Sequence, residues 1–228
     1  MDPVSTNIPR YEMPEPLAVK PPPADCSECG KPVEPGAFCG GWLPRSVHDE
    51  CRWRRDERAQ RVANAEKAIK EIIPSAYRRM SLADDSMRSH RGNRVALNTL
   101  RMWAPGQSII LEGPVGTGKT AALCAFAQDQ MRHSFRTVQW YTEAGVVGKL
   151  KEHMRSGEVY DPLARLLSSH VLVIDDIGTA RPTEWWVEQF ADLIDRAYSN
   201  ERAVVLSTNL SQRQLADHFP YSGERLVS

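Results

Sequence analysis

The sequence contains no long apolar run. No stretch of its 228 residues approaches the roughly 18 consecutive apolar side chains of a membrane helix, and no signal-peptide pattern is present. Internal repeats are also absent, and the formal net charge is zero. Without a membrane or export signal, we expect a globular protein of the cytoplasm.

Composition is uneven along the chain. Several of the 16 prolines lie in the first 44 residues, which indicates a loosely structured N-terminus. That segment accounts for part of the slightly low hydrophobic content of the chain, 41%. Residues 1–25 lack periodicity, and we expect them to be disordered or extended. Residues 52–91 hold eleven Lys/Arg against six Asp/Glu, whereas residues 1–51 hold four against eight. The basic stretch is either a nucleic-acid-binding surface or a solvated helix face.

Four of the five cysteines lie between positions 26 and 51. Cys26-Ser-Glu-Cys29 is followed, after eighteen residues, by His48-Asp-Glu-Cys51. Two ligand pairs, each with a two-residue gap, suit a tetrahedral zinc site. We therefore predict Zn²⁺ bound by Cys26, Cys29, His48 and Cys51, with a structural role because four protein ligands leave no open position. Cys39 is either a spare thiol or a substitute for His48.

A glycine-rich segment follows a short apolar strand at residues 108–120, SIILEGPVGTGKT. The pattern Gly, four residues, Gly-Lys-Thr is the phosphate-binding P-loop, whose backbone N–H groups cradle phosphate oxygens. Lys119 is expected to reach the β- and γ-phosphates of ATP, and Thr120 to ligate Mg²⁺. A chance glycine turn is the alternative, and the strand and helix context disfavours it. The predicted nucleotide-binding residues are Gly113, Pro114, Val115, Gly116, Thr117, Gly118, Lys119, Thr120 and Ala121.

Two acids follow a continuous apolar run at residues 170–178, HVLVIDDIG. Such a run is typical of a buried parallel strand, and ligands bind at the C-terminal edge of such sheets. Asp175 is expected to hold Mg²⁺ through its water shell, and Asp176 to polarise the attacking water. The next strand, 203–207, ends in Thr208-Asn209. We assign the orientation of the water to Asn209, with Thr208 as the second choice.

The spacing of apolar residues, together with the residues that start and end helices, predicts an α/β domain with a parallel sheet. Strands are expected at 108–112, 137–141, 171–174 and 203–207, and helices at 52–73, 90–103, 120–133, 143–155, 183–199 and 211–218. No later segment supplies a fifth strand, so one edge of the P-loop strand should lie open or be covered by a helix. Lys149, Lys151 and Arg155, near the end of one helix, are either ordinary complements of its dipole or contacts to DNA.

Together these residues resemble an AAA+ ATPase of the DnaC/IstB type, the bacterial and phage helicase loaders and transposition helpers. The resemblance covers residues 73–228. Its strings are IPSAYRRMSLADD (73–85), GPVGTGKT (113–120), VLVIDDIG (171–178, with Asp-Asp in place of Asp-Glu), LSTNL (206–210) and SGERLVS (222–228). It implies a three-layer P-loop core, ATP and Mg²⁺, single-stranded DNA, a replicative helicase as partner and an ATP-dependent homo-oligomer.

The resemblance also implies a function and a domain plan. An ATP-dependent loader of a replicative helicase is favoured, because transposition helpers usually have a metal-free front end. The alternatives are an ATP-gated DNA-binding adaptor with little hydrolysis and a zinc interaction module with a vestigial core. Four segments are expected: a tail at 1–25, a zinc-binding module at 26–51, a basic linker helix at 52–73 and a C-terminally short ATPase core at 74–228. The family's catalytic finger arginine usually follows a string like 223–228, so either the chain is truncated, or Arg225 serves instead, or hydrolysis is inefficient.

Overall fold

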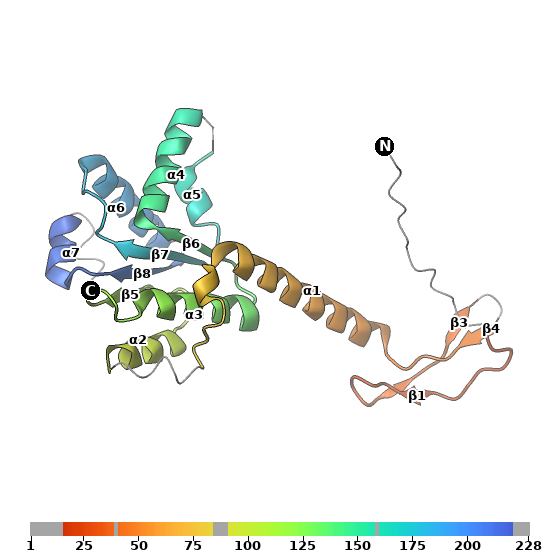
Figure 1. The fold of residues 1–228 in the computed structure, drawn as a ribbon. Helices are drawn as coiled ribbons and strands as arrows, with labels where there is room; N and C mark the ends of the chain where they lie inside the picture. Colours follow the sequence, from red (N-terminus) through yellow and green to blue (C-terminus); the bar gives the residue numbers. More distant parts are fainter. Residues whose placement is uncertain (1–15, 39–40, 84–90, 158–159, 221–228) are drawn as a thin grey trace, which may run out of the picture. The chain divides into compact units, whose positions relative to one another are not determined.

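A computed structural model describes residues 16–38, 41–83, 91–157 and 160–220 of the chain (Figure 1). The chain divides into two compact units, Met1–Gln60 and Arg61–Ser228. None of the helices in the described ranges combines the length and apolar character needed to cross a bilayer.

The first unit is built from two short antiparallel hairpins. Strand β1 (Ala24–Asp25) pairs with β2 (Pro32–Val33), and β3 (Gly36–Phe38) pairs with β4 (Gly41–Leu43). Its buried apolar side chains are Cys26, Val33 and Val47, with Cys51 packed against them. A core of this size is too small to offset the entropy of ordering the segment, so another source of stability is required.

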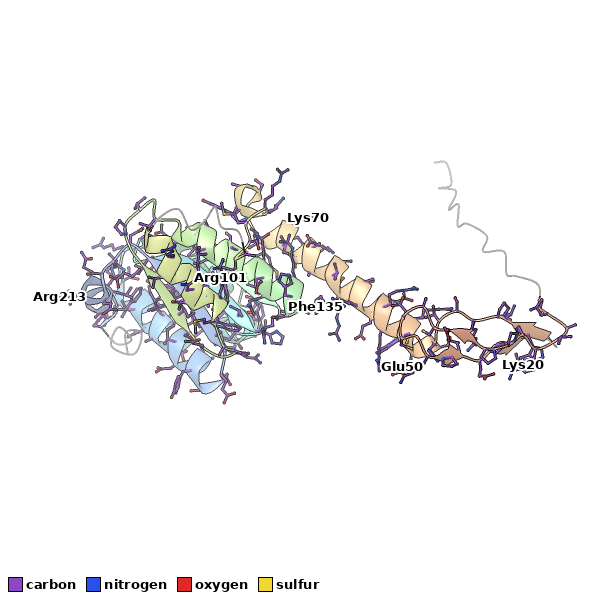
Figure 2. The ribbon with its side chains drawn as sticks, turned by 90° about the horizontal axis from the view of Figure 1, so that it is seen from below. Lys20, Glu50, Lys70, Arg101, Phe135 and Arg213 are labelled. Carbon is purple, nitrogen blue, oxygen red and sulfur yellow. The ribbon has the colours of Figure 1, made fainter. Side chains whose placement is uncertain are left out.

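Helix α1 (Asp49–Ile72) begins in the first unit and ends in the second. It starts three residues before the predicted position, because Asp49 and Glu50 suit the positive end of a helix, and Lys70 suits its last turn. Glu50 and Lys70 are labelled in Figure 2. Arg78 bonds to two carbonyls at the C-terminal end of α1, donating from Nε to Ile73 O at 2.9 Å and from Nη2 to Lys70 O at 2.6 Å.

The second unit is an α/β domain around a four-stranded parallel sheet. Its strands are β5 (Ile109–Glu112), β6 (Val138–Thr142), β7 (Val171–Ile177) and β8 (Ala203–Thr208), in the order β5-β8-β7-β6. Within the described ranges the P-loop strand β5 pairs only with β8. This edge position agrees with the expectation from the sequence.

Helices cover both faces of the sheet, which confirms the predicted three-layer α/β class. Alternate residues of β7 belong to different hydrophobic clusters, one on each face of the sheet. Val171 and Val173 pack with α2 (Arg91–Arg101) and α3 (Lys119–His133). Leu172 and Ile174 pack with α4 (Glu143–Ser156), α5 (Pro162–Leu166), α6 (Glu184–Ser199) and α7 (Gln212–His218). Figure 1 shows α2 and α3 below the sheet and α4, α5 and α6 above it. The two-residue period of a strand produces both cores from one apolar run.

Helix α5 was not predicted from the sequence. Helix α5 is short, and Asp161 caps it by accepting hydrogen bonds from the backbone N–H groups of Leu163 and Ala164. Pro162 occupies its first turn, where the missing N–H costs nothing. The Asp-Pro pair was a readable start signal, but five residues are too few to show helical periodicity.

Candidate nucleotide and metal sites

The P-loop connects β5 to the first turn of α3. Gly113, Gly116 and Gly118 have φ values of 153°, 85° and 85°, a range that residues with a Cβ rarely adopt. Gly118 is the N-terminal cap of α3, so the unpaired N–H groups of that helix begin at Lys119. The loop therefore has the backbone shape that a phosphate cradle needs.

Lys119 extends across the loop toward the end of β8. Its Nζ donates to Gly113 O at 2.7 Å, to Pro114 O at 2.9 Å and to Asn209 Oδ1 at 2.8 Å. Burial lowers the pKa of the Lys119 ammonium, and the charges of Asp176 and Asp175 oppose that shift. A bound phosphate would add a negative partner at this point, which favours the charged form.

The two predicted magnesium ligands lie next to each other. Thr120 Oγ1, in the first turn of α3, donates to Asp175 Oδ1 at 3.2 Å, and the Asp175 residue is only 7% exposed. A hydroxyl and a carboxylate are hard oxygen donors of the kind that Mg²⁺ binds together with substrate phosphates. The residues present therefore fit a magnesium ion on bound ATP.

Asn209 links the lysine to the second acid. Its Nδ2 donates to Asp176 Oδ1 at 2.7 Å, while its Oδ1 accepts from Lys119. Thr208, the second choice for orienting the water, is buried and donates to Ile177 O at 2.7 Å. Because the Thr208 hydroxyl is already hydrogen-bonded within the sheet, Asn209 is better placed than Thr208 to orient a water. Arg225 lies outside the described residues.

Glu143 was not predicted to belong to the site. It is fully buried at the start of α4, where Oε2 accepts from the backbone N–H groups of Gly178, Thr179 and Ala180 at 2.7–3.1 Å. Its Oε1 accepts from Trp186 Nε1 at 2.7 Å. The carboxylate thus fixes the loop that follows β7. No local pattern signals this role, because the partners lie 35 or more residues away in the sequence.

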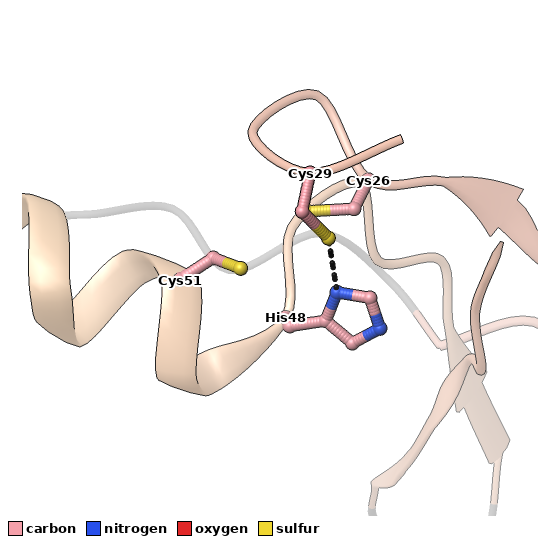
Figure 3. A group of neighbouring side chains, drawn as sticks. All are labelled: Cys26, Cys29, His48 and Cys51. Carbon is pink, nitrogen blue, oxygen red and sulfur yellow. Dashed lines mark hydrogen bonds between the residues drawn. The ribbon is translucent and has the colours of Figure 1, made fainter. Parts of the chain in front are cut away.

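The four predicted zinc ligands come together in the first unit. The ligand atoms of Cys26, Cys29, His48 and Cys51 all lie within 4.8 Å of one another (Figure 3). His48 Nε2 lies 3.0 Å from Pro32 O, so that nitrogen carries the proton and Nδ1 remains available for a metal. Cys39, the open alternative, lies outside the described residues.

Charge makes the same cluster suited to a cation. Burial disfavours the Cys26 thiolate, but hydrogen bonds from the His48, Glu28 and Cys29 backbone outweigh burial and lower the pKa of Cys26 to about 6. Burial, together with the sulfurs of Cys29 and Cys26, raises the pKa of Cys51 to about 11. Three thiolates held this close would repel one another, and a divalent cation would stabilise all three together. The donor set therefore fits Zn²⁺.

The three basic residues proposed for DNA do not share one face of α4. Lys149 Nζ lies 5.5 Å from the ring centre of Tyr141, on β6, whereas Lys151 Nζ lies 5.7 Å from that of Trp185, on α6. Arg155 is in the last turn, one helical turn beyond Lys151. A single DNA strand that contacted Lys149, Lys151 and Arg155 would therefore have to cross from one face of α4 to another.

A polar cavity of about 460 Å³ lies between α4, α5 and β6. Arg165 stands 5.3 Å from the ring centre of Tyr160, which in turn contacts the His153 ring at 4.6 Å. His153 Nδ1 is buried and has no hydrogen-bond partner among the described residues. Cations beside aromatic rings suit a ligand with both negative charge and a flat ring. The lining includes Gln139, Tyr141, Lys149, His153, Tyr160 and Arg165.

The chain resembles known proteins in sequence. The profile of the family described as IstB-like ATP binding protein matches residues 42–224. The replicative helicase loader DnaI of Bacillus subtilis (strain 168) is 22% identical over 215 residues, which cover 87% of this chain and 68% of DnaI. The phage-like element PBSX protein XkdC of the same strain is 32% identical over 109 residues, covering 46% of this chain and 40% of XkdC.

Solved structures share the fold. The crystal structure of the DnaC helicase loader aligns with a TM-score of 0.52 at 24% identity, covering 68% of this chain and 93% of that one. The crystal structure of DnaI aligns with a TM-score of 0.51 at 20% identity, covering 68% and 87%. The family profile spans most of the chain, including the P-loop, both aspartates and Asn209. The chain therefore belongs to the family of IstB-like ATP-binding proteins.

Proposed function

We propose that this protein binds ATP with Mg²⁺ and hydrolyses it. The observation that carries the proposal is the continuous contact from Lys119 through Asn209 to Asp176, beside the Thr120–Asp175 pair. In this assignment Thr120 and Asp175 hold Mg²⁺, which offsets phosphate charge, while Asp176 and Asn209 orient the attacking water. We assign the arginine that acts across a subunit interface to Arg225. Turnover per subunit that rises with protein concentration, and loses that rise in Arg225→Ala, is the outcome that supports this assignment.

We propose further that ATP drives the loading of a replicative DNA helicase onto single-stranded DNA. The likeness to the loader DnaI over 87% of this chain supports the role, and the cysteine–histidine cluster offers a separate unit for gripping the partner. Co-elution with a hexameric replicative helicase in the presence of ATP is the expected result. A chain that hydrolyses little ATP, binds DNA and ignores every helicase offered would instead be an adaptor of the transposition-helper type.

DNA binding has its own expected result. If Lys149, Lys151 and Arg155 contact phosphates, alanine at all three should weaken ATP-dependent binding of single-stranded DNA. The slope of log affinity against log salt concentration should fall by roughly 0.7 for each lost contact. Fluorescence anisotropy across a salt series measures both quantities.

A matched control comes from α1. Lys67→Ala removes one positive charge, as each of the three single variants does, from a side chain that is 78% exposed, and it should leave the slope unchanged. If Lys67→Ala lowers the slope as much as the single variants do, the DNA-binding surface includes the basic helix α1. If the triple variant binds DNA with unchanged affinity and slope, the three residues only complement the dipole of α4. Since Lys149 and Lys151 lie on different faces, the single variants also report whether DNA reaches the cavity or α6.

A further inference from the structure

A β-bulge places both acids opposite one residue of the neighbouring strand. Ile174 pairs with Leu206 and Ile177 pairs with Thr208, so Asp175 and Asp176 together face Ser207. Such a bulge leaves the extra residue without its ladder hydrogen bond and turns its side chain to a new direction. Asp176 shows the consequence, since its φ of 62° lies in the left-handed region that few residues other than glycine occupy.

The Ser207 side chain occupies the position of the lost ladder bond. Its Oγ accepts a hydrogen bond from the backbone N–H of Asp176 at 2.9 Å and donates its own proton to Asp175 Oδ1. Ser207 is 1% exposed, so water does not replace either bond readily. One hydroxyl thus holds the backbone of one acid and the carboxylate of the other.

The opposite side of Asp176 is also held by a side chain. Thr179 Oγ1 lies 3.0 Å from the carbonyl oxygen of Asp176 and 3.3 Å from Glu143 Oε2. Glu143 in turn fixes the Thr179 backbone N–H at 2.9 Å. The strained residue is therefore contacted at both its N–H and its C=O, and such contacts are needed to hold a sparsely populated backbone conformation.

We propose that Ser207 is a positioning residue for both acids. It orients Asp175 toward the magnesium site beside Thr120, and it holds Asp176 in the conformation that brings its carboxylate to Asn209. The inference rests on the proposed binding and hydrolysis of ATP, and it adds a residue that touches neither nucleotide nor metal. Groups that orient metal ligands typically contribute on the order of 10- to 100-fold in metal affinity or activity.

The test is the magnesium dependence of ATP binding in Ser207→Ala. Calorimetric titration of ATP at a series of Mg²⁺ concentrations should show the midpoint raised about 10- to 100-fold, while binding in EDTA stays unchanged. The turnover number should fall with it. Ser207→Thr keeps the hydroxyl and should restore the midpoint. If Ser207→Ala does not fold, Ser207→Cys replaces it in the test. The cysteine thiol is only a weak hydrogen-bond donor and acceptor, so this variant should also raise the Mg²⁺ midpoint.

Ser169→Ala is the matched control. Ser169 is buried, and its Oγ donates to Val171 O at 2.9 Å, at the opposite end of β7. A general loss of stability would affect both alanine variants, whereas only Ser207→Ala should change the Mg²⁺ midpoint. Equal midpoints in the two variants would overturn the inference and leave the proposed function intact. Failure of the unsubstituted chain to bind ATP would overturn both.

Discussion

Lys119→Ala is expected to prevent saturation by ATP at concentrations that saturate the unsubstituted protein. The lysine already points along the P-loop toward Asn209, and no other lysine or arginine of the described residues bonds to this loop. Loss of a charge-assisted contact to phosphate costs about 1.5–3 kcal/mol, which weakens binding roughly 10- to 150-fold. Isothermal titration calorimetry measures the effect directly. Undiminished affinity would contradict the P-loop assignment.

Asp176→Asn is the contrasting variant at the same site. The asparagine keeps the size of the side chain and an oxygen that can accept from Asn209 Nδ2, so ATP should still bind. Turnover should stop, because a neutral amide cannot polarise the attacking water as a carboxylate does. Phosphate release under saturating ATP checks this expectation. Rapid turnover in Asp176→Asn would transfer the catalytic role to another group.

Removal of zinc is expected to unfold the first unit and leave ATP binding intact. Its strands are two or three residues long, and among the residues that the structure describes its buried apolar cluster holds only Cys26, Val33 and Val47, with Cys51 against it. For isolated zinc-finger peptides the metal supplies roughly 10–16 kcal/mol of apparent binding free energy, far more than such a core. The ATP-binding unit has two large clusters of its own and should not depend on the metal.

Metal analysis and limited proteolysis test this result. The protein should contain one zinc ion per chain, lost in Cys26→Ser and in Cys51→Ser, with new cleavage before Gln60. Cys39→Ser is the matched control and should retain the metal. Loss of zinc in Cys39→Ser together with its retention in His48→Ala would show that Cys39 takes the place of His48. Loss of ATP binding on chelation would show that the two units are not energetically separate.

The sequence by itself determined the features that depend on neighbouring residues. The P-loop is readable because its glycines adopt φ values that other residues avoid, and the apolar run before Asp175 is readable because a strand covered on both faces needs no polar positions. The zinc ligands are readable because Cys26 and Cys29, and likewise His48 and Cys51, are separated by two residues, and a turn of that length brings two ligands to one metal. The α/β class followed from these local patterns.

Only the tertiary structure decided how the distant residues meet. The strand order β5-β8-β7 brings Asn209 to Lys119, and a one-residue bulge sets Ser207 against both aspartates. In the sequence Glu143 looks like an ordinary first residue of a helix, whereas in the structure its carboxylate accepts hydrogen bonds from the loop at 178–180. Strand register and bulges depend on packing across the whole sheet, and hydrogen bonds between residues 30 or more positions apart follow from that register. Local sequence preferences carry no information about either.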